Sequence, residues 1–154
     1  MATKTVGELV RGREVYYVRA DLSVHDAVRY MAEREIGAVV VLDVAGDWVA
    51  GIFTERDLMK KIVLPEKDAK TTPVTEVMSR SLVLCEAVES QQACHTRMIK
   101  HRIRHLPVVE EGRLIGLVSL RDLLQEGLSQ REEELKLMTD YIHYIPPDLE
   151  SENR

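Results

Sequence analysis

The chain has 154 residues, which is enough for one ordinary domain or for two small halves that share a core. Its hydrophobic fraction of 45% and charged fraction of 31% are typical of a folded globular protein and exclude a disordered or fibrous one. A formal net charge of -5 argues against a nucleic-acid partner, because phosphate binding needs clustered lysines and arginines.

No stretch approaches the roughly 20 consecutive apolar residues of a membrane-spanning helix. The N-terminal residues lead into Glu8 and Arg11 instead of the apolar core of a signal peptide, so we expect a cytoplasmic protein with no membrane part. Cys85 and Cys94 are too few for a disulfide framework and lack paired metal-ligand spacing. They are expected to be buried thiols, and no metal site is predicted.

The first half of the chain predicts the order strand, helix, strand, strand, helix. The run Val15–Val18 is strand-like, Ser23 stands in front of a helical pattern, and Ala38–Leu42 is a second strand-like run. A glycine-containing turn then predicts a β-hairpin. The following heptapeptide, Gly51–Asp57, is a short apolar run that meets Thr-x-x-Asp, which indicates a buried strand ending at a helix N-terminus. The closing helix includes Leu58–Val63.

The connection between the halves is predicted at residues 67–73, within a stretch that carries Pro65 and Pro73 and has no apolar periodicity. Such a segment is expected to be loosely packed.

The second half repeats the order of the first. Pro73–Met78 resembles Thr5–Val10, Ser81–Leu84 is again strand-like, and His105–Val109 matches the second strand of the first half. The heptapeptide Gly116–Asp122 repeats the glycine, hydroxyl and aspartate positions of the first one. A turn shorter by two residues accounts for the change in spacing, and the closing helix includes residues 123–128.

After the repeats, apolar residues alternate with charged ones at helical spacing. This pattern predicts an extra amphipathic helix over 129–145, ended by Pro146-Pro147 and followed by a tail over 146–154. Its apolar stripe covers either its own chain or a second subunit.

One βαββα repeat, 5–66 or 74–128, is too small to bury both faces of its sheet. Two copies packed sheet against sheet share one core, as repeat units generally require. The predicted fold is therefore α+β (in the broad sense α/β), an intramolecular pseudo-twofold pair with an extra C-terminal helix.

Two repeats that end in Gly-apolar-apolar-Thr/Ser-x-x-Asp, together with Ile103–Val109, resemble a tandem CBS-domain pair, the Bateman module. The likeness runs from about Thr5 to Leu128. It implies two clefts between the repeats that hold AMP, ADP, ATP, NAD or S-adenosylmethionine. It also implies that such modules pair into homodimers and regulate another protein. Because the chain resembles a stand-alone module, the regulated protein is expected to be a separate one, which the sequence does not identify.

The two heptapeptides are the candidate ligand sites. Thr54 and Ser119 stand at helix N-termini, where unpaired N–H groups and the helix dipole suit a phosphate. The resemblance assigns the ribose hydroxyls to Asp57 and Asp122. The alternative is plain helix capping by the same four side chains, and a capping hydroxyl can also face a phosphate.

Basic residues distinguish the two candidate clefts. Arg56 and Arg121 either neutralise phosphate charge or are solvated first-turn arginines. The pair Arg104-His105 matches a position where related modules carry phosphate-contacting residues, whereas the first repeat has Gly37-Ala38 there. We therefore expect the two clefts to differ in phosphate affinity.

Adenine recognition is assigned by the resemblance to the backbone at Ile36 and Ile103, beside aliphatic side chains. Gly37 either lets a ligand approach the backbone closely or satisfies a strained turn.

No catalytic motif is present: the sequence lacks a nucleophile elbow, a Gly-rich phosphate loop and a metalloprotease helix. The sequence thus predicts a regulatory module, not an enzyme, whose ligand is an adenine nucleotide (AMP, ATP or NAD) and not a catalytic cofactor. The alternative is a ligand-independent scaffold that dimerises.

Overall fold

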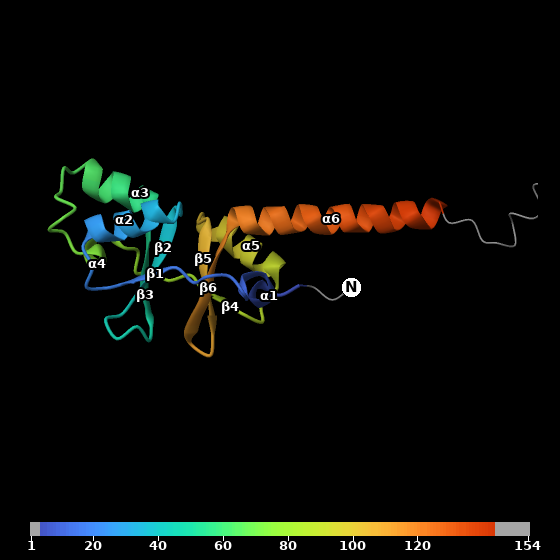
Figure 1. The fold of residues 1–154 in the computed structure, drawn as a ribbon, viewed down its shortest axis with the longest axis horizontal. Helices are drawn as coiled ribbons and strands as arrows, with labels where there is room; N and C mark the ends of the chain where they lie inside the picture. The colour runs from blue at the N-terminus through green and yellow to red at the C-terminus, as the bar shows by residue number, and fades with distance from the viewer. Residues whose placement is uncertain (1–3, 144–154) are drawn as a thin grey trace, which may run out of the picture. The chain divides into compact units, whose positions relative to one another are not determined.

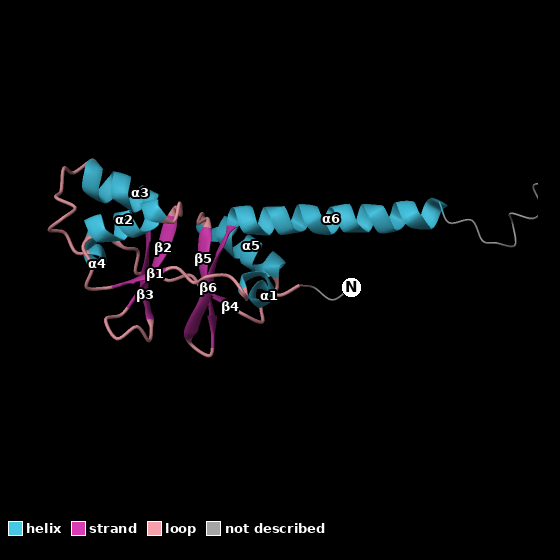
Figure 2. Cartoon of the chain, viewed as in Figure 1, coloured by secondary structure: helices cyan, strands magenta, loops and turns pink. Residues whose placement is uncertain are grey.

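The computed structural model describes residues 4–143, and the chain forms two compact units, Met1–Leu120 and Arg121–Arg154. Figure 1 shows the elements in chain order and Figure 2 their type. The elements up to residue 119 are α1 (Val6–Val10), β1 (Tyr17–Arg19), α2 (Val24–Glu33), β2 (Ala38–Leu42), β3 (Val49–Thr54), α3 (Glu55–Asp57), the π-helix η1 (Leu58–Val63), α4 (Val74–Val77), β4 (Cys85–Glu86), α5 (Gln91–His101), β5 (His105–Glu110) and β6 (Arg113–Ser119). The helix α6 (Leu120–His143) follows.

The strands form two three-stranded sheets of identical topology, β1-β2-β3 and β4-β5-β6. In each sheet the first strand is parallel to the second, and the second is antiparallel to the third. Val18 lies opposite Val41, and Cys85 lies opposite Val108, which are the same positions of the repeat. The predicted pair of βαββα repeats in an α+β fold is confirmed.

Each sheet is covered by the short helix that opens the other repeat. Helix α1 contacts β4, β5 and β6, whereas α4 contacts α2, β3 and η1. The backbone N–H of Val6 donates to the carbonyl of Glu89 at 2.8 Å, and that of Val74 donates to Leu22 at 2.9 Å. These bonds occupy equivalent positions in the repeat, so the two halves exchange their first helices in a pseudo-symmetric way.

Gly51 and Gly116, which open the two heptapeptides, make this exchange possible. A Cβ atom on Gly51 would lie 2.6 Å from the sulfur of Met78 and 2.8 Å from the carbonyl oxygen of Ser79. A Cβ on Gly116 would lie 2.7 Å from the Cβ of Val10. The glycines are therefore needed because another segment of the chain lies directly against the strand.

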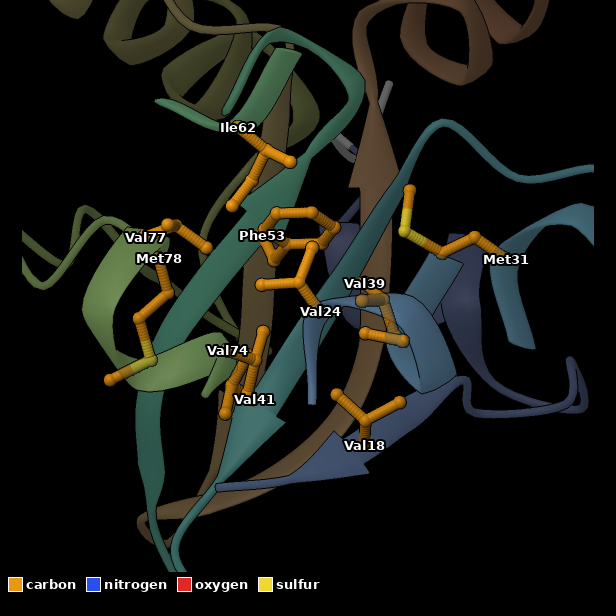
Figure 3. Packing of buried hydrophobic residues seen from close by; sticks show 11 residues of the cluster. Val18, Val24, Met31, Val39, Val41, Phe53, Ile62, Val74, Val77 and Met78 are labelled. Carbon is orange, nitrogen blue, oxygen red and sulfur yellow. The ribbon is translucent and has the colours of Figure 1, made fainter. Parts of the chain in front are cut away.

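The buried core around the first sheet draws on both repeats, as Figure 3 shows. Phe53 of β3 and Val24 of α2 are fully buried and lie in one cluster with Val74 and Val77 of α4. Burial of such side chains contributes roughly 1.5–3 kcal/mol each to the free energy of unfolding. The first repeat thus depends on apolar side chains that lie beyond the connection between the halves.

The strand predicted at Ser81–Leu84 is wrong, because the pairing strand is β4 at Cys85–Glu86. The carbonyl oxygen of Leu84 accepts a hydrogen bond from the Arg97 guanidinium at 2.6 Å. The same guanidinium pairs with the carboxylate of Glu89. A side chain of α5 therefore takes up the backbone group that a strand would have paired. Cys85 and Cys94 are fully buried free thiols, as predicted.

The connection between the repeats is more tightly held than expected. Thr72 is a buried polar residue, and its hydroxyl donates to the carbonyl of Asp68 at 2.7 Å. The carbonyl oxygens of Ala69 and Thr72 accept from the backbone N–H groups of His25 and Val24, each at 2.9 Å. The connection thus satisfies N–H groups in the first turn of α2 that no helical partner could reach.

The closing helix of the second repeat and the predicted C-terminal helix form one element, α6. The predicted helix end at Pro146-Pro147 and the tail lie outside the described residues. Within residues 4–143, no helix combines the length and apolar character needed to cross a bilayer.

The Gly51→Ala substitution is expected to lower the free energy of unfolding by about 1–3 kcal/mol, because the new methyl group overlaps Met78 and the backbone of Ser79. Urea unfolding measures the change. Gly127→Ala is the matched control, since a Cβ there meets no atom within 4 Å and alanine favours a helix. Equal stability of Gly51→Ala and wild type would contradict the close approach.

Arg97→Met is expected to lower stability at neutral pH by about 1 kcal/mol, a value reduced because both partners are partly exposed. The hydrogen bond from Arg97 holds the pKa of Glu89 below its ordinary range. This contribution is therefore present at neutral pH and is lost as the pH falls through the lowered pKa. Unfolding experiments between neutral and acidic pH should show the difference shrinking, with exposed Lys100→Met as the control.

Candidate functional site

A cleft of about 360 Å³ opens within the unit Met1–Leu120, and both repeats contribute to its walls. The first repeat supplies Gly37, the end of β3, α3 and the start of η1. The second repeat supplies the segment after α4 and the approach to β5. The lining residues are Gly37, Ile52, Thr54, Glu55, Arg56, Asp57, Met59, Ser79, Ser81, Leu82, Val83, Arg102, Ile103, Arg104, His105 and Pro107.

Most of the predicted site residues lie in this cleft, although the two repeats place them far apart in the sequence. The cleft contains Gly37, Thr54, Arg56, Asp57, Ile103, Arg104 and His105. The topology explains the meeting: the β3-to-α3 step of the first repeat lies opposite the α5-to-β5 step of the second.

Four predicted residues are not among the lining residues. Ser119 is the last residue of β6, and Arg121 and Asp122 lie in the first turn of α6, in the second unit. Ile36 is partly buried and packs against the core of the first repeat. Its backbone N–H donates to the carbonyl of Met31 at 3.1 Å, so this group serves the end of α2.

Thr54 and Asp57 form a complete capping box at the start of α3. The Asp57 N–H donates to the Thr54 hydroxyl oxygen at 3.4 Å, and the Thr54 N–H donates to Asp57 Oδ2 at 3.0 Å. The Thr54 hydroxyl also donates to Oδ2 at 3.2 Å. The capping alternative is therefore realised, on residues that also line the cleft.

Equivalent backbone bonds join the strand-to-helix step to the start of the neighbouring strand in each repeat. The N–H of Glu55 donates to the carbonyl of Gly37 at 3.0 Å, and the N–H of Leu120 donates to Arg104 at 2.8 Å. Glu55 and Leu120 directly follow the hydroxyl residues of the two heptapeptides. This bond fixes Arg104, and hence one charged wall of the cleft, to the end of β6.

Gly37 does not occupy a left-handed turn. It is not among the residues with positive φ, whereas a Cβ atom there would lie 3.3 Å from the Oε2 atom of Glu55. The missing side chain thus leaves room for the Glu55 carboxylate at the edge of the cleft.

Positive charge predominates in the cleft. Three guanidinium groups, from Arg56, Arg102 and Arg104, outnumber the carboxylates of Glu55 and Asp57. All three arginines are exposed, so each can reorient toward an anion. A site of this composition favours a ligand that carries phosphate groups over a cationic one.

Arg102 was missed by the sequence analysis. It ends α5 in the left-handed conformation, with φ 54°, and Glu35 has the same φ at the equivalent position of the first repeat. A non-glycine residue in this conformation is uncommon. Comparing positions 35 and 102 would have shown that the repeats carry opposite charges here, which is the signal that could have identified Arg102.

The wall made by Ser79, Ser81, Leu82 and Val83 was also missed. It is attached to β3 by an isolated antiparallel bridge between Ile52 and Ser79. The N–H of Ser79 donates to the Ile52 carbonyl at 2.8 Å, and the reverse bond is 3.1 Å long. The wall gives the cleft an apolar surface next to the polar end of α3.

Comparison with curated and solved proteins supports a single family. The chain is 33% identical over 125 residues to the mitochondrial CBS domain-containing protein CBSX3 of Arabidopsis thaliana, a match that covers 79% of this chain and 61% of the relative. The chain therefore spans less than two-thirds of that relative's length. A CBS-domain protein from Burkholderia ambifaria MC40-6 is 40% identical, with a TM-score of 0.75 over 82% of this chain and 95% of that one.

The fold also matches the CBS domain pair of protein MJ0100, solved with 5′-methylthioadenosine and S-adenosyl-L-methionine. The TM-score is 0.74 at 20% identity, over 84% of this chain and 99% of that one, so the likeness concerns the fold alone. The family model for the CBS domain matches twice, at residues 6–64 and 74–129. With two repeats in register and one cleft between them, the chain belongs to the CBS-domain family as a tandem pair.

Proposed function

We propose that this protein is a regulatory module that binds an adenosine-containing nucleotide and passes the signal by a conformational change to a protein partner. The observation that carries the proposal is the meeting of Thr54 and Asp57 with Arg104 and His105 in one cleft. A ligand with different affinities for two arrangements of the repeats shifts the balance between them.

The chemistry of the walls supports a phosphorylated adenosine ligand. The Asp57 carboxylate suits a ribose diol, the Thr54 hydroxyl and the arginines suit phosphate, and Leu82 and Ile103 offer apolar surface to a base. The surplus of guanidinium groups favours AMP, ATP or NAD over S-adenosylmethionine, whose sulfonium is positive. The two ligands of MJ0100 are bound by that protein. The ligand preference proposed for this chain rests on the charged residues of its own cleft.

The two halves are proposed to differ in phosphate affinity. At the positions of Arg102 and Arg104 the first repeat has Glu35 and Gly37. The first repeat therefore offers a phosphate fewer cationic partners at these positions than the second repeat offers in the cleft at Asp57.

Titration calorimetry of ligand-free protein with AMP, ATP, NAD and S-adenosylmethionine tests the proposal. We expect a phosphate-bearing nucleotide to bind more tightly than S-adenosylmethionine. Asp57→Asn should weaken binding in this cleft at least tenfold, because the amide accepts only through one oxygen. Asp122→Asn is the matched control, with the same change in the other heptapeptide, and should leave the affinity of this cleft unchanged.

Failure of the wild-type protein to bind any of these ligands would favour the alternative, a ligand-independent scaffold. In that case Asp57→Ala and Asp122→Ala would each remove only a helix-capping side chain, with a loss of about 1 kcal/mol. Thermal unfolding with and without nucleotide separates the alternatives, since only a binding protein is stabilised by added ligand.

We also propose that two copies pair through α6. Leu124, Leu128, Leu135 and Met138 follow heptad spacing on this helix, and each is more than half exposed within the chain. In proteins most of a helix's stability comes from packing of its apolar face and not from helix propensity, which favours a partner for this stripe.

The oligomeric state, measured by light scattering after size exclusion, tests this pairing. Wild type is expected to be a dimer, and Leu128→Glu with Leu135→Glu is expected to be monomeric, because the charges cannot be buried unpaired. Lys136→Glu, an exposed substitution on the same helix, is the control. A monomeric wild type, or a dimer unaffected by the double substitution, would contradict pairing through α6.

Catalysis forms no part of the proposed role, and the regulated partner is proposed to be a separate protein. The cytoplasmic location is likewise a proposal, since one relative is mitochondrial by its name.

A further inference from the structure

Lys61 connects the carboxylate of the cleft to a helix of the other repeat. Its Nζ atom lies 2.9 Å from Oδ1 of Asp57 and donates to the carbonyl oxygen of Val77 at 2.7 Å. The Asp57 side chain is 13% exposed and that of Lys61 is 43% exposed, so the carboxylate end of this ion pair is the end shielded from solvent.

The π-helix η1 carries Lys61 from the cleft toward α4. It begins at Leu58, directly after Asp57, and the Leu64 N–H donates to the Met59 carbonyl at 3.0 Å, five residues back. Segments of π-helix are rare and are frequent at functional sites. The wide turn holds Lys61 between Asp57 and the last residue of α4.

Helix α4 leads directly into the wall of the cleft. Val77 ends α4, and Ser79, two residues later, pairs with Ile52 and lines the cleft. Lys61 therefore links Asp57, through the end of α4, to the segment that forms another wall of the cleft.

The acceptor positions on Asp57 decide how a ribose can bind. A carboxylate accepts about four hydrogen bonds. Oδ2 accepts from the N–H and the hydroxyl of Thr54, and Oδ1 accepts from Lys61. A ribose diol needs two positions, so one protein donor must leave. The Thr54 hydroxyl can turn to a phosphate, whereas Lys61 is also held by Val77.

The second repeat has no lysine at this position. Counting from the aspartate of each heptapeptide, Lys61 corresponds to Glu126, which follows Asp122 by four residues. A glutamate at that spacing repels an aspartate instead of pairing with it. The two repeats thus carry opposite charges at this position.

The following inference rests on the proposed nucleotide binding. We propose that Lys61 is a positioning residue that holds the Asp57 carboxylate in the orientation that accepts the ribose. Through its bond to Val77, Lys61 also couples the binding of a ribose at Asp57 to α4. The ribose hydroxyls contact Asp57, and Lys61 acts through Asp57 without touching the ligand.

The test compares the affinities of ATP and 2′-deoxy-ATP, and of AMP and 2′-deoxy-AMP, for wild type and Lys61→Met. Wild type should prefer the ribonucleotides. Lys61→Met should weaken ribonucleotide binding about tenfold and deoxynucleotide binding much less, because a carboxylate without its lysine loses the orientation needed for two hydroxyls. The ratio of the two affinities is the readout, since a purely structural role would lower both equally.

Four further variants complete the design. Lys60→Met makes the same charge change at an exposed neighbour on η1 and should keep the ratio within about twofold. Lys61→Arg, which retains the cation, should restore most of the preference. Lys61→Gln keeps a donor for the Val77 carbonyl and serves if Lys61→Met does not fold. In an Asp57→Asn background, loss of Lys61 should have no further effect on the ratio.

The outcomes separate this inference from the proposed function. If wild type binds none of the nucleotides, nucleotide binding fails and this inference with it. If Asp57→Asn abolishes binding but the Lys61 variants keep the wild-type affinity and ratio, only the role of Lys61 is overturned. Equal weakening of ribo- and deoxynucleotides would also overturn it, because Lys61 would then contribute charge or stability alone.

Discussion

The close approach of α1 and α4 to the opposite sheets is the constraint on which the rest of the structure depends. Neither three-stranded sheet can cover its own apolar face, and each takes the missing side chains from the first helix of the other repeat. Gly51 and Gly116 permit the contact because no side chain stands between strand and helix. The cleft is a result of this exchange: the chain that leaves α4 must pass along β3 before it reaches β4, and residues 79–83 become a wall.

The sequence predicted the two sheets because their pattern occurs twice. An apolar run is ambiguous alone, but the same run preceded by a helical pattern and followed by Thr/Ser-x-x-Asp at matching spacing predicts a βαββα unit. The exchange of α1 and α4 could not be predicted, because similarity between Thr5–Val10 and Pro73–Met78 does not specify which sheet each segment covers. The strand expected at Ser81–Leu84 was wrong for a related reason: Arg97, thirteen residues later, binds the Leu84 carbonyl.

At the candidate site, the sequence identified the residues that belong to recognisable motifs, namely the heptapeptide and the Arg104-His105 pair. Arg102 and Lys61 have no such motif, since one depends on a left-handed helix end and the other on a π-helical turn. Both differ between the repeats, with Glu35 and Glu126 in the equivalent places. The two repeats thus share a pseudo-symmetric backbone but differ in the charges of equivalent side chains. The duplicated fold therefore has two halves that are unequal in charge.

The exchanged helices have a further consequence for the origin of the chain. A single repeat on its own would expose the sheet face that its own first helix does not reach. A second copy could cover that face with its first helix, and the first helix of the original copy would then cover the sheet of the second. Such a pair is a domain-swapped dimer. Duplication and fusion of its gene would fix the swap within one polypeptide, remove its dependence on concentration, and allow each half to diverge without losing its match. The connection held by Thr72 keeps the two exchanged helices within one polypeptide.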